Sequence, residues 1–241
     1  MASKSIRLDK AVSHSFEVSR KEATYLIKQG MVSVDGEVVS DPSFKIAIDT
    51  PLTLDGNDFT AEEYLKKRVF MLNKPEDYVC ADRDSRYLTV SSIFSEEMHA
   101  QDLHCAGRLD VDTVGLVIVT DDGDLAHRIT APRYEIEKCY LAVVKNKLCD
   151  KDIARFASGL KYPEETKPYK SAKLEILSDN EALVTVTEGR FHEVKRLFEC
   201  VGNEVLELKR LSIGKLKLDE SLELGAYRLL DDDEVALIFE K

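Results

Sequence analysis

One short apolar segment constrains the fold of this chain more than any other part of its sequence. Residues 114–119 read VGLVIV, and a run this rich in β-branched side chains predicts a strand in the core. Carboxylates flank the run on both sides, at Asp110, Asp112, Asp121 and Asp122. Because Asp122 precedes a glycine, we expect the last two acids to form the turn that closes the strand. The segment therefore predicts a rigid strand with reactive groups at its ends.

The rest of the chain alternates strand and helix patterns without a regular βαβ rhythm. Strand patterns stand at 69–81, at 137–146 and, as a hairpin, at 171–189. Helical spacing of apolar residues occurs at 151–160 and at 191–202. This mixture predicts an α+β fold rather than a doubly wound parallel sheet.

The first sixty or so residues have the signals of a compact module of their own. A short helix pattern comes first, and Ser19 with Glu22 then forms the capping-box signature of a second helix. Gly30 is placed to end that helix. Asp35-Gly36 lies between two short β-runs, which is a strong hairpin signal. We therefore expect a small helix-and-hairpin unit at the N-terminus.

Basic side chains gather around the second helix of this module, at Arg7, Lys10, Arg20, Lys21 and Lys28. Charged helix faces are most often simply solvated. The alternative is a surface that contacts nucleic-acid phosphates. The residues alone leave both interpretations open.

Charge and composition limit the classes of protein that the chain can belong to. The net charge of −11 argues against a simple nucleic-acid binder, but acids crowd the C-terminal end, so local basic patches need separate consideration. The five cysteines are widely spaced and form no C-x-x-C pair, which disfavours a disulfide framework or a zinc site. With neither a signal-peptide core nor an apolar run of about 18 residues, a cytoplasmic protein is expected.

The spacing of the residues does not match the motifs of several common metal-binding and catalytic sites. Asp110-Val111-Asp112 resembles a metal motif, but a hard divalent cation needs about six oxygen ligands and the spacing of an EF-hand is absent. His192-Glu193 begins like a zinc-hydrolase motif, yet position 196 is arginine. The nucleotide-binding loop signatures and the G-x-S-x-G hydrolase motif are also missing from the sequence.

A carboxylate, cations and an aromatic ring remain as candidates. Asp110 has Arg108 two residues before it, Tyr140 lies on a predicted strand, and Lys195 lies near a predicted helix start. A ring can stack on a nucleobase, and a cation can hold a carboxylate ionised and in position. Such a set would suit a nucleoside, although composition cannot assemble it in space.

Four segments together resemble the pseudouridine synthases. GRLDVDTVGLVIVTDDGDLAHRIT is similar to the central motif of that family, and VFMLNKPEDYVCA, EKCY and EGRFHEVKRLFECVG are similar to its other motifs. The N-terminal module resembles an S4 RNA-binding domain through RLDK, SRKEA, IKQG and VSVDG. The resemblance covers nearly the whole chain in order. Length and the form of the central motif point to the small-subunit branch rather than to its large-subunit relatives.

The resemblance implies isomerisation of a uridine in RNA, with no metal or other cofactor. The catalytic carboxylate would be Asp110, acting as nucleophile on C1′ or as base on the C2′ proton. Tyr140 would stack on the target base and Lys195 would pair with Asp110. Arg108 is a candidate for contacting phosphate or filling the space that the base leaves. Asp112 would have only a local hydrogen-bonding role.

Two residues depart from the family pattern. Asp77 stands where glycine is usual in N-K-P-x-G, and aspartate tolerates positive φ better than most residues. Glu193 stands where glutamine is common, which changes the charge near the expected site.

The resemblance also implies an organisation and a partner. Residues 1–59 would form the S4-like RNA-binding domain and 68–241 the catalytic domain, built on a mixed, largely antiparallel sheet. The polar segment 56–68 indicates a linker, whose bounds we place at 60–67. The substrate would be 16S rRNA, at uridine 516 by resemblance, or a partly assembled small subunit, bound by a monomer away from membranes. The alternatives are an enzyme acting on 23S rRNA, a non-catalytic RNA-binding or assembly protein, and a metal-dependent hydrolase.

Overall fold

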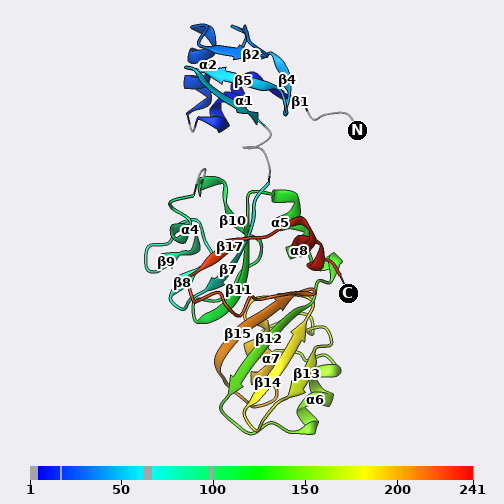
Figure 1. Cartoon of the computed structure of the whole chain (residues 1–241). Coiled ribbons are helices and arrows are strands. Elements are labelled where there is room, and N and C mark those ends of the chain that lie inside the picture. Colours follow the sequence, from blue (N-terminus) through cyan, green and yellow to red (C-terminus); the bar gives the residue numbers. More distant parts are fainter. Residues whose placement is uncertain (1–4, 17, 62–66, 98–99, 241) are drawn as a thin grey trace. The chain divides into compact units, whose positions relative to one another are not determined.

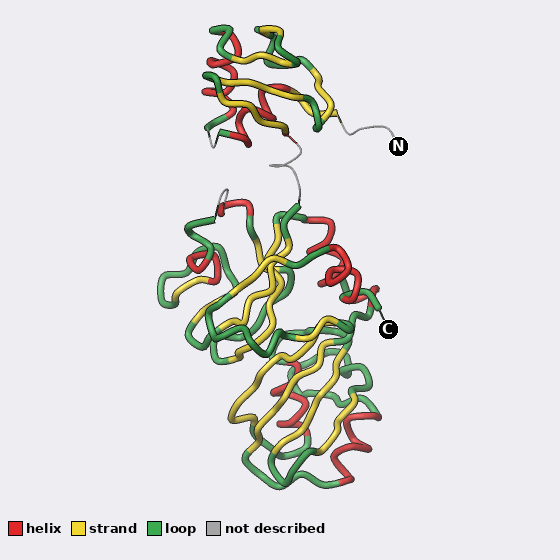
Figure 2. Tube along the Cα trace, in the orientation of Figure 1, coloured by secondary structure: helices red, strands yellow, loops and turns green. Residues whose placement is uncertain are grey.

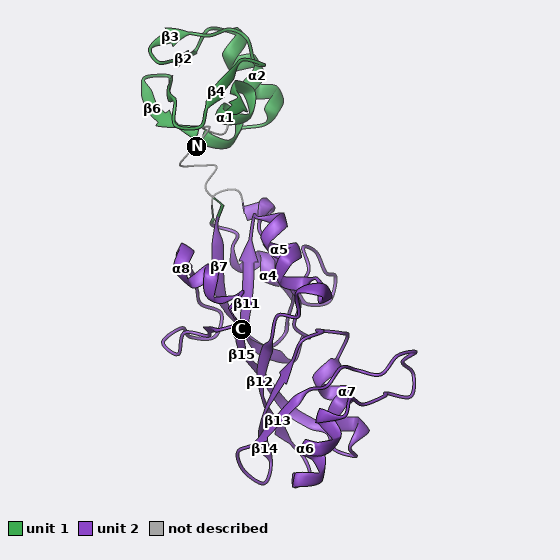
Figure 3. Cartoon of the chain, turned by 90° about the vertical axis from the view of Figure 1, so that its right-hand side faces the viewer, with its two compact units in different colours: residues 1–67, 97–99 green, residues 68–96, 100–241 purple. Residues whose placement is uncertain are grey.

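The computed structural model describes residues 5–16, 18–61, 67–97 and 100–240. The chain divides into two compact units, residues 1–67 with 97–99 and residues 68–96 with 100–241 (Figures 1 and 3). Each unit has its own apolar core, so each is described separately.

In its described residues, the first unit packs two helices, α1 and α2, against small antiparallel sheets. Its elements are β1 (Ser5–Arg7), α1 (Leu8–Ser15), α2 (Arg20–Lys28), β2 (Val32–Val34), β3 (Glu37–Val38), β4 (Lys45–Ala47), β5 (Pro51–Leu54) and β6 (Asn57–Thr60). Strand β1 pairs with β4, and the others take the order β3-β2-β5-β6. Val12 of α1, Ile27 of α2 and Leu52 of β5 meet in the core of the unit.

The predicted start of the second helix is confirmed, and one predicted loop is wrong. The Ser19 hydroxyl accepts the Glu22 N–H at 3.2 Å, and Asp35-Gly36 turns β2 into β3 with positive φ at both residues. Asp55-Gly56 repeats that turn before β6. Residues 57–60, at the start of the segment 56–68 that the sequence indicated as a linker, therefore form a hairpin strand. Asp55-Gly56 is as strong a hairpin signal as Asp35-Gly36. Most of the predicted linker 60–67 lies outside the described residues.

The second unit is built on one large mixed sheet in the order β13-β14-β12-β15-β11-β7-β17, with β10 beside β11 and β16 beside β15 (Figure 2, strands in yellow). The sheet strands are β7 (Val69–Lys74), β10 (His104–Cys105), β11 (Thr113–Thr120), β12 (Lys138–Val144), β13 (Lys173–Ile176), β14 (Glu181–Val186), β15 (Val205–Ile213), β16 (Leu216–Lys217) and β17 (Tyr227–Leu229). The short strands β8 (Tyr78–Val79) and β9 (Leu88–Thr89) pair beside the sheet. Within the sheet β11 and β15 run parallel, and the other pairings among its described strands are antiparallel, which confirms the predicted mixed α+β architecture.

Strand β11 is apolar on both faces because helices cover the sheet on both sides. Val117 and Val119 belong to the same apolar core as residues of α7 (Glu193–Cys200) and α6 (Asp150–Ala157). Leu116 and Ile118 belong to the opposite core, under α5 (Gly123–Thr130). Successive side chains of a strand alternate between its faces, so a continuous apolar run is what a strand covered twice requires. Two further α-helices among the described residues are α4 (Val90–Ile93) and α8 (Asp232–Leu237), and Ala100–Asp102 and Pro132–Tyr134 form short 3-10 helices.

The acids that follow β11 begin a helix, whereas the sequence predicted a turn. The Asp122 carboxylate accepts the N–H groups of Asp124 and Leu125 at 3.0 and 3.1 Å, which is the N-cap of α5. Aspartate is as favourable at a helix N-cap as in a turn. The helical spacing of the apolar residues Leu125 and Ile129 favours the helix over the turn. Asp121 instead pairs with Arg68 at 3.0 Å.

The acidic C-terminal end is locally organised. Asp231 and Glu234 form a capping box at the start of α8, and Arg228 pairs with both Asp219 and Glu234 at 2.8 Å. No helix in the described ranges has both the length and the apolarity to cross a membrane.

Candidate active site

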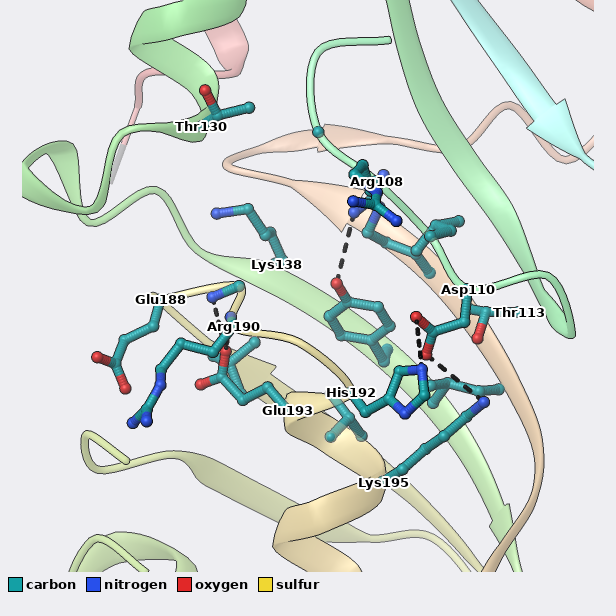
Figure 4. Close-up of a pocket in the computed structure, with 18 residues that line it drawn as sticks. Arg108, Asp110, Thr113, Thr130, Lys138, Glu188, Arg190, His192, Glu193 and Lys195 are labelled. Carbon is teal, nitrogen blue, oxygen red and sulfur yellow. Dashed lines mark hydrogen bonds and ion pairs between the residues drawn. The ribbon is translucent and has the colours of Figure 1, made fainter. Parts of the chain in front are cut away.

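A pocket opens in the second unit where the loop before β11, the start of β12 and the N-terminal end of α7 meet (Figure 4). The loop 107–112 provides Arg108 and Asp110, and β12 provides Lys138 and Tyr140. The side chains from the remaining elements include Thr113, Glu188, His192, Glu193, Lys195 and Arg210. The structure therefore brings together all four residues that the sequence proposed for catalysis and substrate binding.

A buried lysine fixes the turn that carries Asp110. The Lys74 ammonium donates to the carbonyls of Val111, Thr113 and Pro75 at 3.3, 2.8 and 2.9 Å, and the side chain is fully buried. Burial lowers the pKa of Lys74. Three carbonyl acceptors satisfy the ammonium, so this end of β7 ties the turn after Asp110 to the sheet.

Asp77 supports the same turn through its backbone. Its N–H donates to the Val111 carbonyl at 3.0 Å, and its φ of +63° lies in the left-handed region. Asp77 therefore adopts the conformation that glycine would supply, at a cost of about 1 kcal/mol. This departure from the family pattern leaves the turn intact.

The Asp110 carboxylate faces two potential cations (Figure 4). Oδ1 lies 3.4 Å from Nε2 of His192, and Oδ2 lies 3.5 Å from Nζ of Lys195. Lys195 is closer to Asp112, at 2.5 Å, so it bridges the two aspartates rather than serving Asp110 alone. Burial opposes ionisation of Asp112, but the hydrogen bond and charge of Lys195 outweigh it and lower the pKa of that carboxyl.

Tyr140 lies beneath the pocket with its hydroxyl near Arg210. Its side chain is buried because alternate residues of β12 face α7. Arg210, only 2% exposed, donates Nε to the Leu116 carbonyl at 2.7 Å and Nη1 to the Tyr140 hydroxyl at 3.4 Å. Among the described residues, Nη2 of Arg210 and the Thr113 hydroxyl have no hydrogen-bond partner although both are buried. Both atoms belong to pocket-lining residues and could serve a ligand.

Lys138 and Glu193 line the other side of the pocket. Burial lowers the pKa of Lys138 to about 8, and the charge of Arg210 adds to the shift. Its ammonium donates to the Ile136 carbonyl at 2.9 Å. Glu193 accepts the N–H groups of Gly189 and Arg190 at 2.6 and 2.8 Å, while burial raises its pKa. Glu193, which stands where glutamine is common in the family, thus holds the loop before α7.

The other basic residues of this region separate by role. Arg108 is exposed at the pocket rim (Figure 4). Arg190 and Arg196 both pair with Glu165, so they brace the loop before β13. Of Arg190, Lys195 and Arg196, Lys195 is the one that faces Asp110.

The five residues of the first unit that the sequence proposed for RNA binding are exposed, and two of them share one acid. Arg7 and Arg20 pair with buried Asp9 at 2.9 and 2.8 Å, whereas Lys10, Lys21 and Lys28 lie on the exposed surface of the helices. The hydrogen bond from Arg7, aided by that from Arg20, holds the pKa of Asp9 below its ordinary value. Arg7 and Arg20 therefore also stabilise the unit.

Three important residues escaped the sequence reasoning. His192 was considered only as part of a failed zinc motif, and the alternating pattern of β15 gave no reason to bury Arg210. Lys74 was visible within the first motif, but its role depends on carbonyls 37 and 39 residues away. No group of three or more His, Cys, Asp or Glu side chains in the described part of the chain is placed to hold a metal ion.

A positioned carboxylate, a buried tyrosine and cations in one pocket, in a chain with a separate small unit that exposes lysines and arginines on its helices, are typical of an RNA-directed enzyme of nucleoside chemistry. Residues 68–200 match the RNA pseudouridylate synthase family and residues 6–49 match the S4 domain. The chain belongs to the RNA pseudouridylate synthase family, whose members are isomerases, and this confirms the resemblance.

Full-length relatives support this membership. The chain is 42% identical over 233 residues to "Ribosomal small subunit pseudouridine synthase A" of Salmonella typhimurium and to the protein of the same name in Escherichia coli K12. Each match covers 97% of this chain and all of the relative. A solved structure described as a pseudouridylate synthase is 40% identical, with a TM-score of 0.69, and covers 97% of this chain and 99% of its own.

Proposed function

We propose that this protein converts one uridine of 16S rRNA to pseudouridine, with Asp110 as the reacting carboxylate. The observation that carries the proposal is the placement of Asp110, on a turn fixed by Lys74 and between His192 and Lys195. The full-length similarity to enzymes named for the small subunit supports the choice of RNA. By resemblance the target is uridine 516.

In the proposed reaction the bond from C1′ to N1 of the base breaks and a bond from C1′ to C5 forms. Asp110 either attacks C1′ as a nucleophile or removes the C2′ proton as a base. The base rotates while its ring is held against Tyr140. The proton lost from C5 is balanced by the one gained at N1, so the product is an isomer of the substrate.

The target base must leave its stack to reach the pocket, which costs a few kcal/mol, roughly, and less in an irregular RNA region. Arg108, exposed at the pocket rim, is placed to contact phosphate or to occupy the space that the base leaves. Binding of RNA by the N-terminal unit, through Lys10, Lys21 and Lys28 with Arg7 and Arg20, would offset part of this cost.

The acidic C-terminal end would face away from RNA, which reconciles a net charge of −11 with an RNA partner. We infer a monomer that acts in the cytoplasm on 16S rRNA or on a partly assembled small subunit. A turnover assay that compares protein-free rRNA with subunit precursors would separate these two substrates.

Carbodiimide labelling and primer extension on 16S rRNA test the proposal in cells that lack this gene. One pseudouridine stop should vanish and should return with the wild-type gene but not with Asp110→Asn. If every stop persists, the small-subunit assignment is refuted. A stop lost from 23S rRNA would favour the large-subunit alternative, and activity abolished by chelators would favour the metal-dependent hydrolase.

A further inference from the structure

An exposed aromatic ring stands immediately beside the candidate active site. Phe191 is 61% exposed although it lies one residue before the pocket-lining His192. It is absent from the apolar clusters formed by the described residues. A large apolar ring held in solvent gains little for the fold, so its position calls for a reason outside the fold.

The ring is held in a fixed orientation by its neighbours. Phe191 stacks on the His192 imidazole with ring centroids 3.7 Å apart and planes inclined by 19°. The Arg196 guanidinium lies 5.1 Å from the same ring and is itself anchored to Glu165 at 2.6 Å. Stacking and cation–π contacts of this kind fix the ring without covering it.

The stacked pair of Phe191 and His192 lies directly beside the Asp110 carboxylate. His192 contacts Asp110 at 3.4 Å, and its φ of +51° is a left-handed conformation that a residue other than glycine adopts at a cost. Strain of this kind persists where the surroundings over-determine it, and it clusters at functional sites. Here it directs the imidazole toward Asp110 while the ring of Phe191 stays at the surface (His192 and Asp110 in Figure 4).

We propose that Phe191, backed by His192, is a stacking platform for the nucleobase next to the target uridine in the bound RNA. This inference rests on the proposed function, because the stacked base is the unflipped neighbour of the uridine on which Asp110 acts. Bases of every kind have a π-face, so the platform contributes affinity without strict sequence preference.

A cycle that pairs protein and RNA changes tests the platform. Wild type and Phe191→Ala are compared on a 16S rRNA fragment and on fragments with an abasic residue at the 5′ or 3′ neighbour of the target. On intact RNA we expect KM and the RNA dissociation constant to rise about tenfold or more with kcat nearly unchanged, since stacking acts in binding. One of the two abasic fragments lacks the base that stacks on Phe191. On that fragment Phe191→Ala should have no further effect on KM or on the dissociation constant.

Matched variants complete the design. Phe191→Trp and Phe191→Tyr should keep wild-type affinity, and Leu224→Ala, which alters an equally exposed residue outside the pocket lining, should leave all constants unchanged. Equal losses for Phe191→Ala on intact and both abasic fragments overturn the platform. Losses confined to ribonucleoprotein particles also overturn it, because they assign Phe191 to a protein contact.

The same experiment keeps the two claims apart. Inactivity of the wild type on the fragment and on subunit particles refutes the proposed function. The platform is then still judged by the ratio of dissociation constants on intact and abasic RNA. Wild-type turnover with no loss in Phe191→Ala refutes the platform alone.

Discussion

At the scale of single residues, the site depends on how one lysine is shared between two carboxylates. Lys195 lies 2.5 Å from exposed Asp112 and 3.5 Å from Asp110. The side chain of Asp112 is 65% exposed, so water can replace much of the stabilisation that it provides to the Lys195 ammonium. We therefore propose that the ammonium acts mainly on Asp110 and that Asp112 contributes little to its position.

This arrangement predicts unequal effects of two substitutions. Lys195→Met should lower kcat about 100-fold or more, since it removes a positioned cation from the reacting carboxylate. Asp112→Asn should change kcat by less than about fivefold, because the exposed pair contributes at most about 1 kcal/mol. Single-turnover rates on 16S rRNA measure both variants. Equal losses for the two would contradict the assignment.

Lys138 makes stability depend on pH in a defined direction. Its pKa in the folded protein is about 8, below its ordinary 10.5, so between these values the unfolded chain binds more protons. Relative to Lys138→Met, the wild type should therefore gain stability as pH rises from 8 to 10.5, by about 3 kcal/mol at most. Urea unfolding of both proteins at pH 7.5 and pH 10 measures the difference, and a difference that stays constant refutes the prediction.

Sequence reasoning proposed residues that the structure brings into one pocket, but not the groups that support them. Asp110, Tyr140 and Lys195 were proposed because motif residues keep their order along the chain. The roles of Lys74, His192 and Arg210 depend on contacts that only folding creates. The positions of Arg108 and Lys138 at the pocket likewise follow from the meeting of two distant segments.

At the scale of elements, the site depends on the close pairing of β11 with β15. Gly115 has a φ of +102°, and a Cβ there would lie 2.3 Å from the Arg210 carbonyl oxygen and 2.8 Å from its nitrogen. The parallel pair that positions Arg210 beside Tyr140 therefore requires glycine at this position.

Gly115→Ala should destabilise the second unit by about 3 kcal/mol and lower activity, because the clash is with backbone atoms and the φ is strained. Thermal unfolding followed by circular dichroism measures the change. Gly123→Ala is the matched control, since it lies at a helix start with open space around the added Cβ. A loss below about 1 kcal/mol in Gly115→Ala would contradict the packing described.

Elements with one dominant signal were predictable from the sequence, and ambiguous ones were not. Strand β11 follows from its continuous apolar run, and helices α2, α6 and α7 follow from apolar periodicity. Helix α5 was missed because Asp122-Gly123 suits both a turn and an N-cap. Strand β6 was missed because its Asn and Asp residues lower the β-propensity that would have marked it.

At the scale of the whole molecule, a strongly acidic chain has to bind an acidic polymer. The basic surface of the first unit is the proposed solution, with Lys10, Lys21 and Lys28 exposed and free of the Asp9 pairing. Bound lysines displace counterions from RNA, which makes affinity depend on salt.

Replacing Lys10, Lys21 and Lys28 by glutamine should weaken RNA binding. It should also reduce the magnitude of the slope of log affinity against log salt concentration by about 2 to 3. Fluorescence anisotropy across a salt series measures this slope. Glutamine at Lys151, Lys173 and Lys217 makes the same change in net charge in the second unit and serves as the control. A wild-type slope in the first triple variant would show that this surface is only solvated.

The central claim is that Asp110 performs the chemistry in a protein whose RNA binding lies largely elsewhere. The most direct measurement is tritium release from [5-³H]uridine-labelled 16S rRNA by wild type and by Asp110→Asn, with RNA affinity measured in parallel. We predict release by the wild type, none above background for Asp110→Asn, and dissociation constants within about threefold of each other. Release by Asp110→Asn at a rate near that of the wild type would contradict the account.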